Sequence, residues 1–142
     1  MKHKPLRVDI ITIFPEMVMP YLQGAMLGRG QAAQVLDLRA HQLRTWTSDA
    51  HQTVDDRPFG GGPGMVMKVE PIDLAVRALK VRKRDGSMPA SAKKTRVILT
   101  SAKGKTFTQA DAVRLAKYDR LVFICGRYEG VDERVASHLV DE

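Results

Sequence analysis

Apolar runs and amphipathic stretches alternate along this chain. The candidate strands span residues 7–14, 34–39, 96–100 and 121–125; the first of them is rich in β-branched residues, which predicts a buried strand. The amphipathic stretches repeat apolar residues at helical spacing; they span residues 15–26, 70–83, 108–116 and 131–139. Strands that alternate with helices indicate an α/β fold with a mostly parallel sheet flanked by helices. The run at 121–125 lacks polar alternation, which predicts a central strand buried on both faces.

Single residues predict where the helices begin and end. Pro15 suits the first turn of a helix, whereas Pro20 interrupts that helix. Gly28 and Gly30 then end it, and Thr108 is the expected N-cap of a later helix. All these elements are expected in one domain, because 142 residues provide one sizeable core and hardly two.

Two glycine-bearing loops follow predicted strands, at Ser101–Lys105 and Gly126–Arg134. In open α/β sheets, ligands bind beyond the carboxyl ends of the strands, and glycine lets backbone groups approach a ligand. Such backbone groups suit an adenine edge or a ribose, although tight turns without a ligand are the alternative. Three side chains that precede the next helix are expected to face a pocket: Arg127, Tyr128 and Glu129. Three more suit a helix start and a surface ion pair: Asp132, Glu133 and Arg134.

Residues 41–64 are polar and then glycine-rich, without periodicity, and a loop of this length is usually functional or disordered. The glycines at 60–62 and 64 follow Asp55, Asp56 and Arg57. They form neither a Walker P-loop nor a dinucleotide fingerprint, because the required Lys-Ser/Thr and strand–helix context are missing. We expect this loop to become ordered around a substrate. A flexible linker and a nucleotide-phosphate site are the alternatives.

The chain is strongly basic, with a net charge of +7 and a pI near 9.8. This balance favours a polyanionic partner, most simply a nucleic acid, although a basic protein without such a partner is the plain alternative. The cations crowd into one stretch that is predicted to be a solvated loop: Lys80, Arg82, Lys83, Arg84, Lys93, Lys94 and Arg96.

The sequence carries no signal for a membrane span, secretion or a metal site. No apolar run approaches ~20 residues, and the stretch after the basic N-terminus is predicted to be a strand rather than a signal peptide. Cys125 is the lone cysteine and has no partner for an internal disulfide, which indicates a reducing cytoplasm. The histidines show no metal-ligand spacing with it.

Two long motifs resemble the signature stretches of the bacterial tRNA (guanine-N1)-methyltransferases: Val54–Met65 and Ile124–Val135. Ile13–Met17 also resembles the start of those enzymes, and the likeness runs in order along the whole chain. The resemblance implies a homodimeric, knotted SPOUT methyltransferase. It further implies S-adenosylmethionine as methyl donor and, as target, N1 of the guanosine 3′ of the tRNA anticodon (position 37).

The resemblance also implies roles for individual residues. Those expected to bind the donor are Leu99, Thr100, Ser101, Ala102, Gly104, Gly126 and Tyr128. Those expected to support the reaction are Arg127 and Glu129. Those expected in a substrate loop are Asp55, Arg57, Pro63 and Gly64. The donor loop departs from the family's Leu-Ser-Pro-Gln-Gly, because Thr100–Gly104 reads Thr-Ser-Ala-Lys-Gly and Leu99 replaces an aromatic residue.

Enzymes of this family continue beyond the position of Glu142. The strand that completes the knot, a helical C-terminal domain and the aspartate that acts as general base are expected there. Residues 1–142 are therefore predicted to be an incomplete S-adenosylmethionine-binding SPOUT domain. The family also implies a metal ion, Mg²⁺, for which the sequence identifies no ligands. A donor-binding or RNA-binding fragment without turnover is the alternative to an active enzyme.

Overall fold

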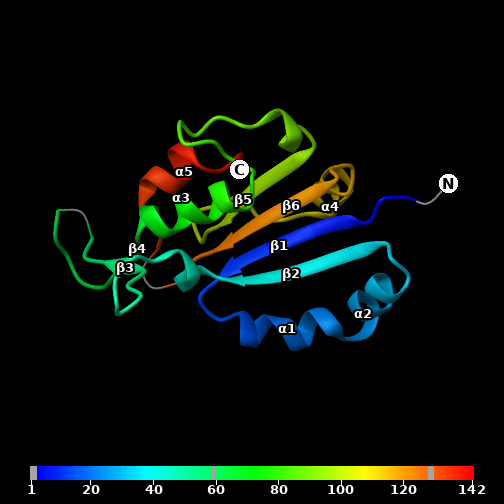
Figure 1. Ribbon diagram of the computed structural model, residues 1–142, viewed down its shortest axis with the longest axis horizontal. Coiled ribbons are helices and arrows are strands. Elements are labelled where there is room, and N and C mark those ends of the chain that lie inside the picture. Colours follow the sequence, from blue (N-terminus) through cyan, green and yellow to red (C-terminus); the bar gives the residue numbers. More distant parts are fainter. Residues whose placement is uncertain (1–2, 59, 128–129) are drawn as a thin grey trace.

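A parallel four-stranded sheet forms the centre of the molecule in this computed structural model, which describes residues 3–58, 60–127 and 130–142. In the order β2–β1–β6–β5, the strands are Leu36–Gln42, Leu6–Thr12, Arg120–Cys125 and Thr95–Thr100. Figure 1 shows these strands side by side with the helices around them. The predicted α/β fold is confirmed, and β6 lies inside the sheet as expected.

All pairings within this sheet are parallel, so the carboxyl ends of its strands meet at one side. We call this side the carboxyl edge and the opposite side the amino edge. At the carboxyl edge Thr12 pairs in register with Gln42, and Thr100 pairs with Cys125. The loops after β5 and β6 therefore leave the sheet next to each other.

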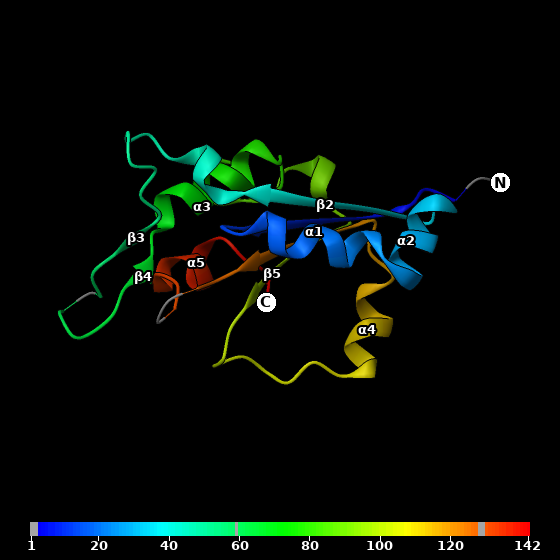
Figure 2. The ribbon, with the colours of Figure 1, turned by 90° about the horizontal axis from the view of Figure 1, so that it is seen from below.

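The helices form separate groups around the sheet. Along β2 lie α1 (Pro15–Gln23) and α2 (Ala25–Ala32), whereas α3 (Val69–Ala78) packs against α5 (Glu133–His138). Figure 2 shows α4 (Gln109–Leu115) away from α3, after the long loop that follows β5. The remaining elements are two 3-10 turns, Leu43–Trp46 and Ala90–Ala92, and a hairpin of β3 (Asp55–Asp56) and β4 (Val66–Met67).

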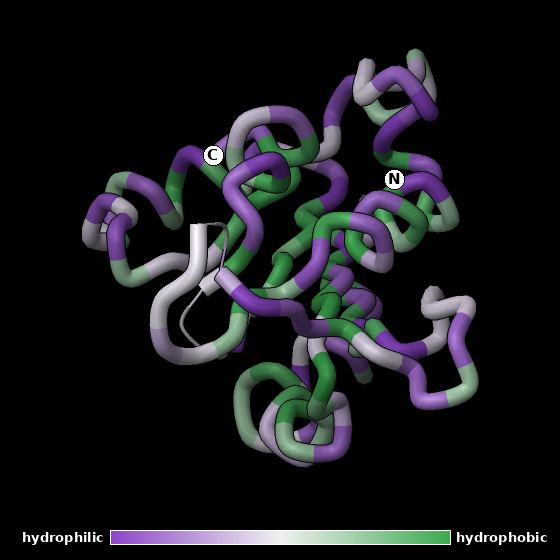
Figure 3. Tube along the Cα trace, turned by 90° about the vertical axis from the view of Figure 1, so that its left-hand side faces the viewer, coloured by the Kyte–Doolittle hydropathy of each residue, from purple (hydrophilic) through white to green (hydrophobic). Residues whose placement is uncertain are grey.

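The main core lies between the sheet and the pair α3 and α5. Alternate strand residues face it, because side chains of a strand point to its two faces in turn; among them are Ile11, Val97 and Val122. Ile72 and Val76 of α3, four positions apart, cover these residues, and all five side chains are at most 1% exposed. Figure 3 shows hydrophobic segments gathered in the middle of the molecule with hydrophilic segments mostly around them.

A buried carboxylate ties strands of the sheet together. Asp9 on β1 is fully buried and accepts hydrogen bonds from Arg7 Nε at 2.9 Å, His41 Nε2 at 2.7 Å and Arg120 Nε at 2.7 Å. Burial raises the pKa of Asp9, but the hydrogen bonds from these partners outweigh it and hold the pKa below its ordinary value. Arg120 also donates to the Leu79 carbonyl at 2.7 Å. The cluster therefore joins β1, β2 and β6 to the end of α3.

The structure corrects the predicted course of the first helical stretch. Pro20 does not interrupt the helix: it lies inside α1, on an exposed position where water can reach the carbonyl that loses its partner. Gly24 ends α1 in an extended conformation, and Gly28 and Gly30 lie inside α2 rather than ending a helix. Gly30 is suited to this position because a Cβ there would lie 2.6 Å from Leu36 Cδ1.

The helix predicted at 70–83 is also shorter than expected. It ends at Ala78, after which Lys80 adopts a left-handed φ of 60°. Val81 N donates to Val76 O at 3.0 Å, the bond that closes a Schellman motif. Glycine usually occupies the left-handed position of this motif, so nothing in the sequence signals the stop.

The predicted basic loop is only partly solvated. Arg82 is buried and pairs with Asp141 at 2.8 Å, and Arg96 lies 3.4 Å from Glu142. The backbone of Glu142 runs beside β5, where its carbonyl accepts a hydrogen bond from Leu99 N at 2.8 Å. These two arginines therefore hold the last residues of the chain against β5 and are not free cations of a loop.

Candidate functional site

The strands that carry the predicted donor loops end together at the carboxyl edge. Thr100 and Cys125 are register partners, and Thr100 Oγ1 donates to the Ile124 carbonyl at 3.2 Å. Burial raises the pKa of the Cys125 thiol, and a hydrogen bond with Thr100 offsets this only in part. Cys125 is thus a neutral thiol at neutral pH, at the end of β6 and next to Thr100.

The loop after β5 forms an exposed turn. Residues 101–110 are all exposed, and Gly104 N donates to Ser101 O at 3.1 Å. Lys103 N donates to Ser101 Oγ at the same distance, 3.1 Å. A Cβ on Gly104 would lie 3.1 Å from Ser101 O, so a side chain there would crowd the turn. The turn is shaped by its own hydrogen bonds and still presents backbone groups to solvent.

The loop after β6 uses its glycine differently. A Cβ on Gly126 would lie 2.8 Å from Val131 Cγ2, so the missing side chain provides room for packing inside the loop. The helix that follows starts as predicted: Asp132 is the N-cap of α5, accepts a hydrogen bond from Arg134 N at 2.9 Å and pairs with its guanidinium at 2.8 Å. The hydrogen bond from Arg134 lowers the pKa of Asp132. Tyr128 and Glu129 lie outside the described residues.

Arg127 is held at the carboxyl edge by an aromatic side chain. Its guanidinium carbon lies 4.6 Å from the centre of the Phe14 ring, within the range of a cation–π interaction. Phe14 follows β1 and is the N-cap residue of α1. The sequence places Phe14 only within a family motif, and no local pattern indicates that it would meet a residue after β6.

Met67 joins the glycine-rich hairpin to the loop after β6. Its backbone N donates to Gly130 O at 3.0 Å, and its carbonyl accepts a hydrogen bond from Asp132 N at 3.0 Å. Arg127 N points at the Met67 sulfur at 3.1 Å, and the Met67 side chain is fully buried. A methionine in an apolar run carries no signal of such a role, so sequence reasoning missed this connection.

The predicted substrate loop is the tip of the β3–β4 hairpin. Asp55 pairs in register with Met67, and Arg57, Pro63 and Gly64 follow in the segment that leads back to β4. Left-handed φ angles occur at Gly60 (84°), Gly61 (85°), Gly62 (110°) and Gly64 (86°), a conformation that other residues adopt only with strain. The run of glycines therefore has a conformational cause.

The structure brings most of the predicted site residues to the carboxyl edge in two groups. Leu99 and Thr100 end β5, the turn with Ser101, Ala102 and Gly104 follows, and Gly126 and Arg127 follow Cys125, the register partner of Thr100. The hairpin residues reach this region through Met67 and not through the sheet. Among the described residues, no group of three or more His, Cys, Asp or Glu side chains could hold a metal ion. No helix in the described part of the chain is long and apolar enough to span a membrane.

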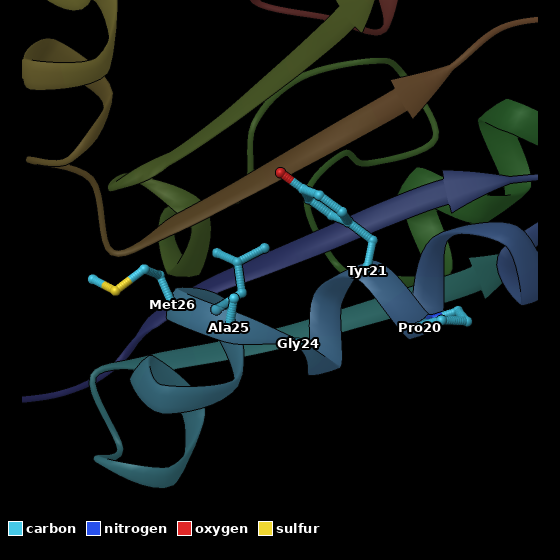
Figure 4. Close-up of a pocket in the computed structure, with 6 residues that line it drawn as sticks. Pro20, Tyr21, Gly24, Ala25 and Met26 are labelled. Carbon is cyan, nitrogen blue, oxygen red and sulfur yellow. The ribbon is translucent and has the colours of Figure 1, made fainter.

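Two hollows of the surface lie apart from these loops. One of about 370 Å³ opens at the junction of α1 and α2, where Tyr21 and Met26 project from the two helices with Gly24 between them (Figure 4). Tyr21 is 77% and Met26 is 73% exposed. The other hollow, of about 940 Å³, is lined by residues at the amino ends of β1 and β2. Neither is lined by a residue predicted to bind donor or substrate.

Comparison with known proteins identifies the family. The family model described as tRNA (Guanine-1)-methyltransferase TrmD matches residues 6–142. The chain is 50% identical over 131 residues to the tRNA (guanine-N(1)-)-methyltransferase of Thermobifida fusca, covering 92% of the chain and 47% of that protein. The corresponding protein of Parafrankia sp. is 45% identical over 137 residues (96% of the chain, 46% of that protein). The chain thus spans about half the length of the curated relatives it matches. Because the family model covers nearly the whole chain, the chain belongs to the tRNA (guanine-1)-methyltransferase family.

Proposed function

We propose that this chain is the donor-binding part of a cytoplasmic tRNA methyltransferase. The enzyme transfers a methyl group from S-adenosylmethionine to N1 of the guanosine on the 3′ side of the anticodon. The observation that carries the proposal is the start of two loops, with exposed first residues, at the neighbouring strand ends Thr100 and Cys125 in a chain of this family. Ligands of open α/β sheets bind at such strand ends.

The reaction sets clear demands on the protein. Methyl transfer to a ring nitrogen is an in-line displacement, and the reacting atoms must be held about 3–3.5 Å apart. The bound donor supplies an electrophilic methyl group on a sulfonium. The protein must hold the guanine in line, remove the N1 proton with a general base and favour the negative charge that develops on the base.

Arg127 is our candidate for the favourable charge. Its guanidinium is exposed at the carboxyl edge and is oriented by the Phe14 ring. In this position it would stabilise the charge that develops on the guanine or pair with the donor carboxylate. Glu129 is proposed to contact the guanine or the donor, without acting as the general base.

The turn after β5 fits a donor of this kind. Its exposed backbone amides and carbonyls match the hydrogen-bonding edge of an adenine, and the lack of a side chain at Gly104 keeps the approach open. Leu99, Ser101 and Ala102 are proposed as further contacts, with Gly126 and Tyr128 contributing from the neighbouring loop. We assign no step to Mg²⁺, because the described residues provide no cluster of ligands for it.

The glycine-rich hairpin is proposed to close over the target base through Asp55, Arg57, Pro63 and Gly64. Two backbone hydrogen bonds of Met67 join this hairpin to the loop after β6. The hairpin and the loop that carries Arg127 are thereby tied to each other through backbone groups. This link supports a role in the substrate site over that of a plain linker.

Donor binding can be tested on the 142-residue chain by calorimetry with S-adenosylmethionine. We expect saturable binding that is lost in Ala102→Trp, because a bulky side chain would fill the space beside the turn. Ala50→Trp is the matched control, since Ala50 is also exposed in a turn but lies in another loop. Equal binding by both variants would remove the turn from the donor site.

The alternatives give different results in the same experiments. The first alternative is a donor-binding or RNA-binding fragment without turnover. In that case the 142-residue chain would bind the donor, but the whole natural protein would show no methyl transfer to tRNA that lacks the modification. A nucleotide-phosphate site in the glycine loop would bind ATP in preference to S-adenosylmethionine. Binding of the donor together with turnover by the whole protein supports the methyltransferase.

We also propose that the protein acts as a homodimer, with α1 and α2 in the contact. These helices expose large apolar side chains next to each other: Met17 at 69%, Tyr21 at 77% and Met26 at 73%. A second copy would remove this surface from water, which favours association by ~25 cal/mol per Å² of apolar area. Sedimentation equilibrium of Tyr21→Glu against wild type tests the contact, and an unchanged mass would contradict it.

A further inference from the structure

We propose that the amino edge of the sheet carries a second RNA-contacting surface, which binds phosphates of the tRNA away from the methylated base. The surface consists of Lys80, Lys93, Lys94 and Lys117, which we call the amino-edge patch. The inference rests on the proposed tRNA substrate and adds a place where the RNA backbone is held.

One backbone contact and one side-chain contact join the three parts of the chain that carry these four lysines. Lys93 and Lys94 precede β5, and Lys117 lies in the turn before β6. Asp119 N donates to the Lys94 carbonyl at 2.9 Å, which holds the two turns together. Arg120, at the start of β6, donates to the carbonyl of the residue before Lys80 at 2.7 Å. Figure 1 shows the segment before β5 and the turn after α4 at the same end of the sheet.

The lysines of the patch contribute nothing to the ion pairs of the described structure. All four are exposed, and the salt bridges found among the described residues involve none of them. Nearby arginines behave differently: Arg82 pairs with Asp141, and Arg120 pairs with Asp9. These two arginines therefore stabilise the fold, whereas the four lysines leave their charge available to a partner.

A phosphate backbone is the partner that this surface fits best. Lysine is a compact point charge that suits a phosphate, and phosphate contacts position the RNA without depending on its base sequence. The patch and the predicted donor loops are separated by the length of β5, Thr95–Thr100, which is about 20 Å at ~3.3 Å per residue. About six stacked nucleotides at ~3.4 Å each cover this distance. One RNA arm can thus present a base at the carboxyl edge and phosphates at the amino edge.

The test measures the binding of unmodified tRNA to the 142-residue chain by fluorescence anisotropy over a range of salt concentrations. The patch variant is Lys93→Gln with Lys94→Gln. The control variant is Arg29→Gln with Arg39→Gln, which removes the same charge from exposed positions on α2 and β2. Circular dichroism and melting of both variants establish that they fold like wild type.

The proposal predicts that the patch variant binds about tenfold more weakly at low salt, because two phosphate contacts are lost. The slope of log K against log salt should fall by about two, one per lysine. The control variant should stay within about twofold of wild type. Equal weakening in both variants would show a general charge effect and overturn the patch, as would unchanged binding in both.

Two further results would also overturn the proposal. The first is a wild-type chain that does not bind tRNA at all. The second is a patch variant that loses binding to phosphatidylserine vesicles but keeps its tRNA affinity, which would assign the patch to a membrane. Donor binding is measured separately by calorimetry, so a failure of the patch leaves the methyltransferase proposal standing, and a chain without donor affinity refutes that proposal by itself.

Discussion

Asp9→Asn should destabilise the protein strongly, because Asp9 is the fully buried carboxylate that compensates the charge of Arg120 and Arg7. Removing one partner of a buried pair typically costs about 3–5 kcal/mol, since the other charge stays buried without compensation. The Arg120 side chain is only 16% exposed, whereas that of Arg7 is 31% exposed and can turn toward water. We therefore expect the lower end, about 3 kcal/mol, or about 10 °C in melting temperature for a domain of this size.

Urea unfolding followed by circular dichroism measures this loss. Asp37→Asn is the matched control: Asp37 also pairs with an arginine, Arg39 at 2.8 Å, but the two side chains are 35% and 49% exposed. An exposed pair contributes about 1 kcal/mol or less. Equal effects of the two substitutions would refute the reasoning that burial makes the Asp9 cluster important.

The pH dependence provides a second check of the same residue. The folded-state pKa of Asp9 lies below its ordinary value. The stabilisation is therefore fully present above the unfolded pKa, about 3.9, and is lost as the pH falls through the folded pKa. The difference in stability between wild type and Asp9→Asn should be complete at pH 7 and shrink below about pH 4. A difference that does not change with pH would contradict the assignment to this ionisation.

Three other features of the structure predict measurable changes. Gly62→Ala should cost about 1 kcal/mol because it places a Cβ at a left-handed φ of 110°. Gly24→Ala should be tolerated, because Gly24 has an ordinary φ of −97°. Equal resistance of the two variants to limited proteolysis would contradict this. Phe14→Leu and Arg127→Met should show a coupling of about 0.5–1 kcal/mol in a double-mutant cycle of unfolding, as for a cation–π pair, and additive effects would argue against the contact. Thr108→Ala should cost about 1 kcal/mol because Thr108 and Asp111 form a capping box on α4; Thr106→Ala, in an exposed position outside the helix, is the control.

The fold could be predicted largely from periodicity. Three of the four strands of the main sheet, β1, β5 and β6, are formed where runs with β-branched residues occur, and Thr108 is the N-cap of α4 as the residue type indicates. Bounds were less accurate: β2 spans Leu36–Gln42 where residues 34–39 were expected, and α5 spans Glu133–His138 within the expected 131–139. These ends depend on pairing with a neighbouring strand or on a cap, which the chain pattern alone does not determine.

What the sequence does not indicate is which distant residues meet. The glycine stops expected at Gly28 and Gly30 were wrong because close packing on Leu36, and not a turn, accounts for Gly30. The contacts of Met67 with the loop after β6, and of Phe14 with Arg127, join segments more than fifty residues apart. Such contacts follow from the topology of the sheet, so they became apparent only with the structure.

The most direct test of the donor site is a titration of the amide NMR spectrum with S-adenosylmethionine. The amides of Ser101 to Gly104 should shift together with those of Gly126 and Arg127, with one common dissociation constant, because the two loops start at paired strand ends. Shifts confined to the glycine hairpin or to the amino edge, or no saturable shift at all, would contradict a donor held between these two loops.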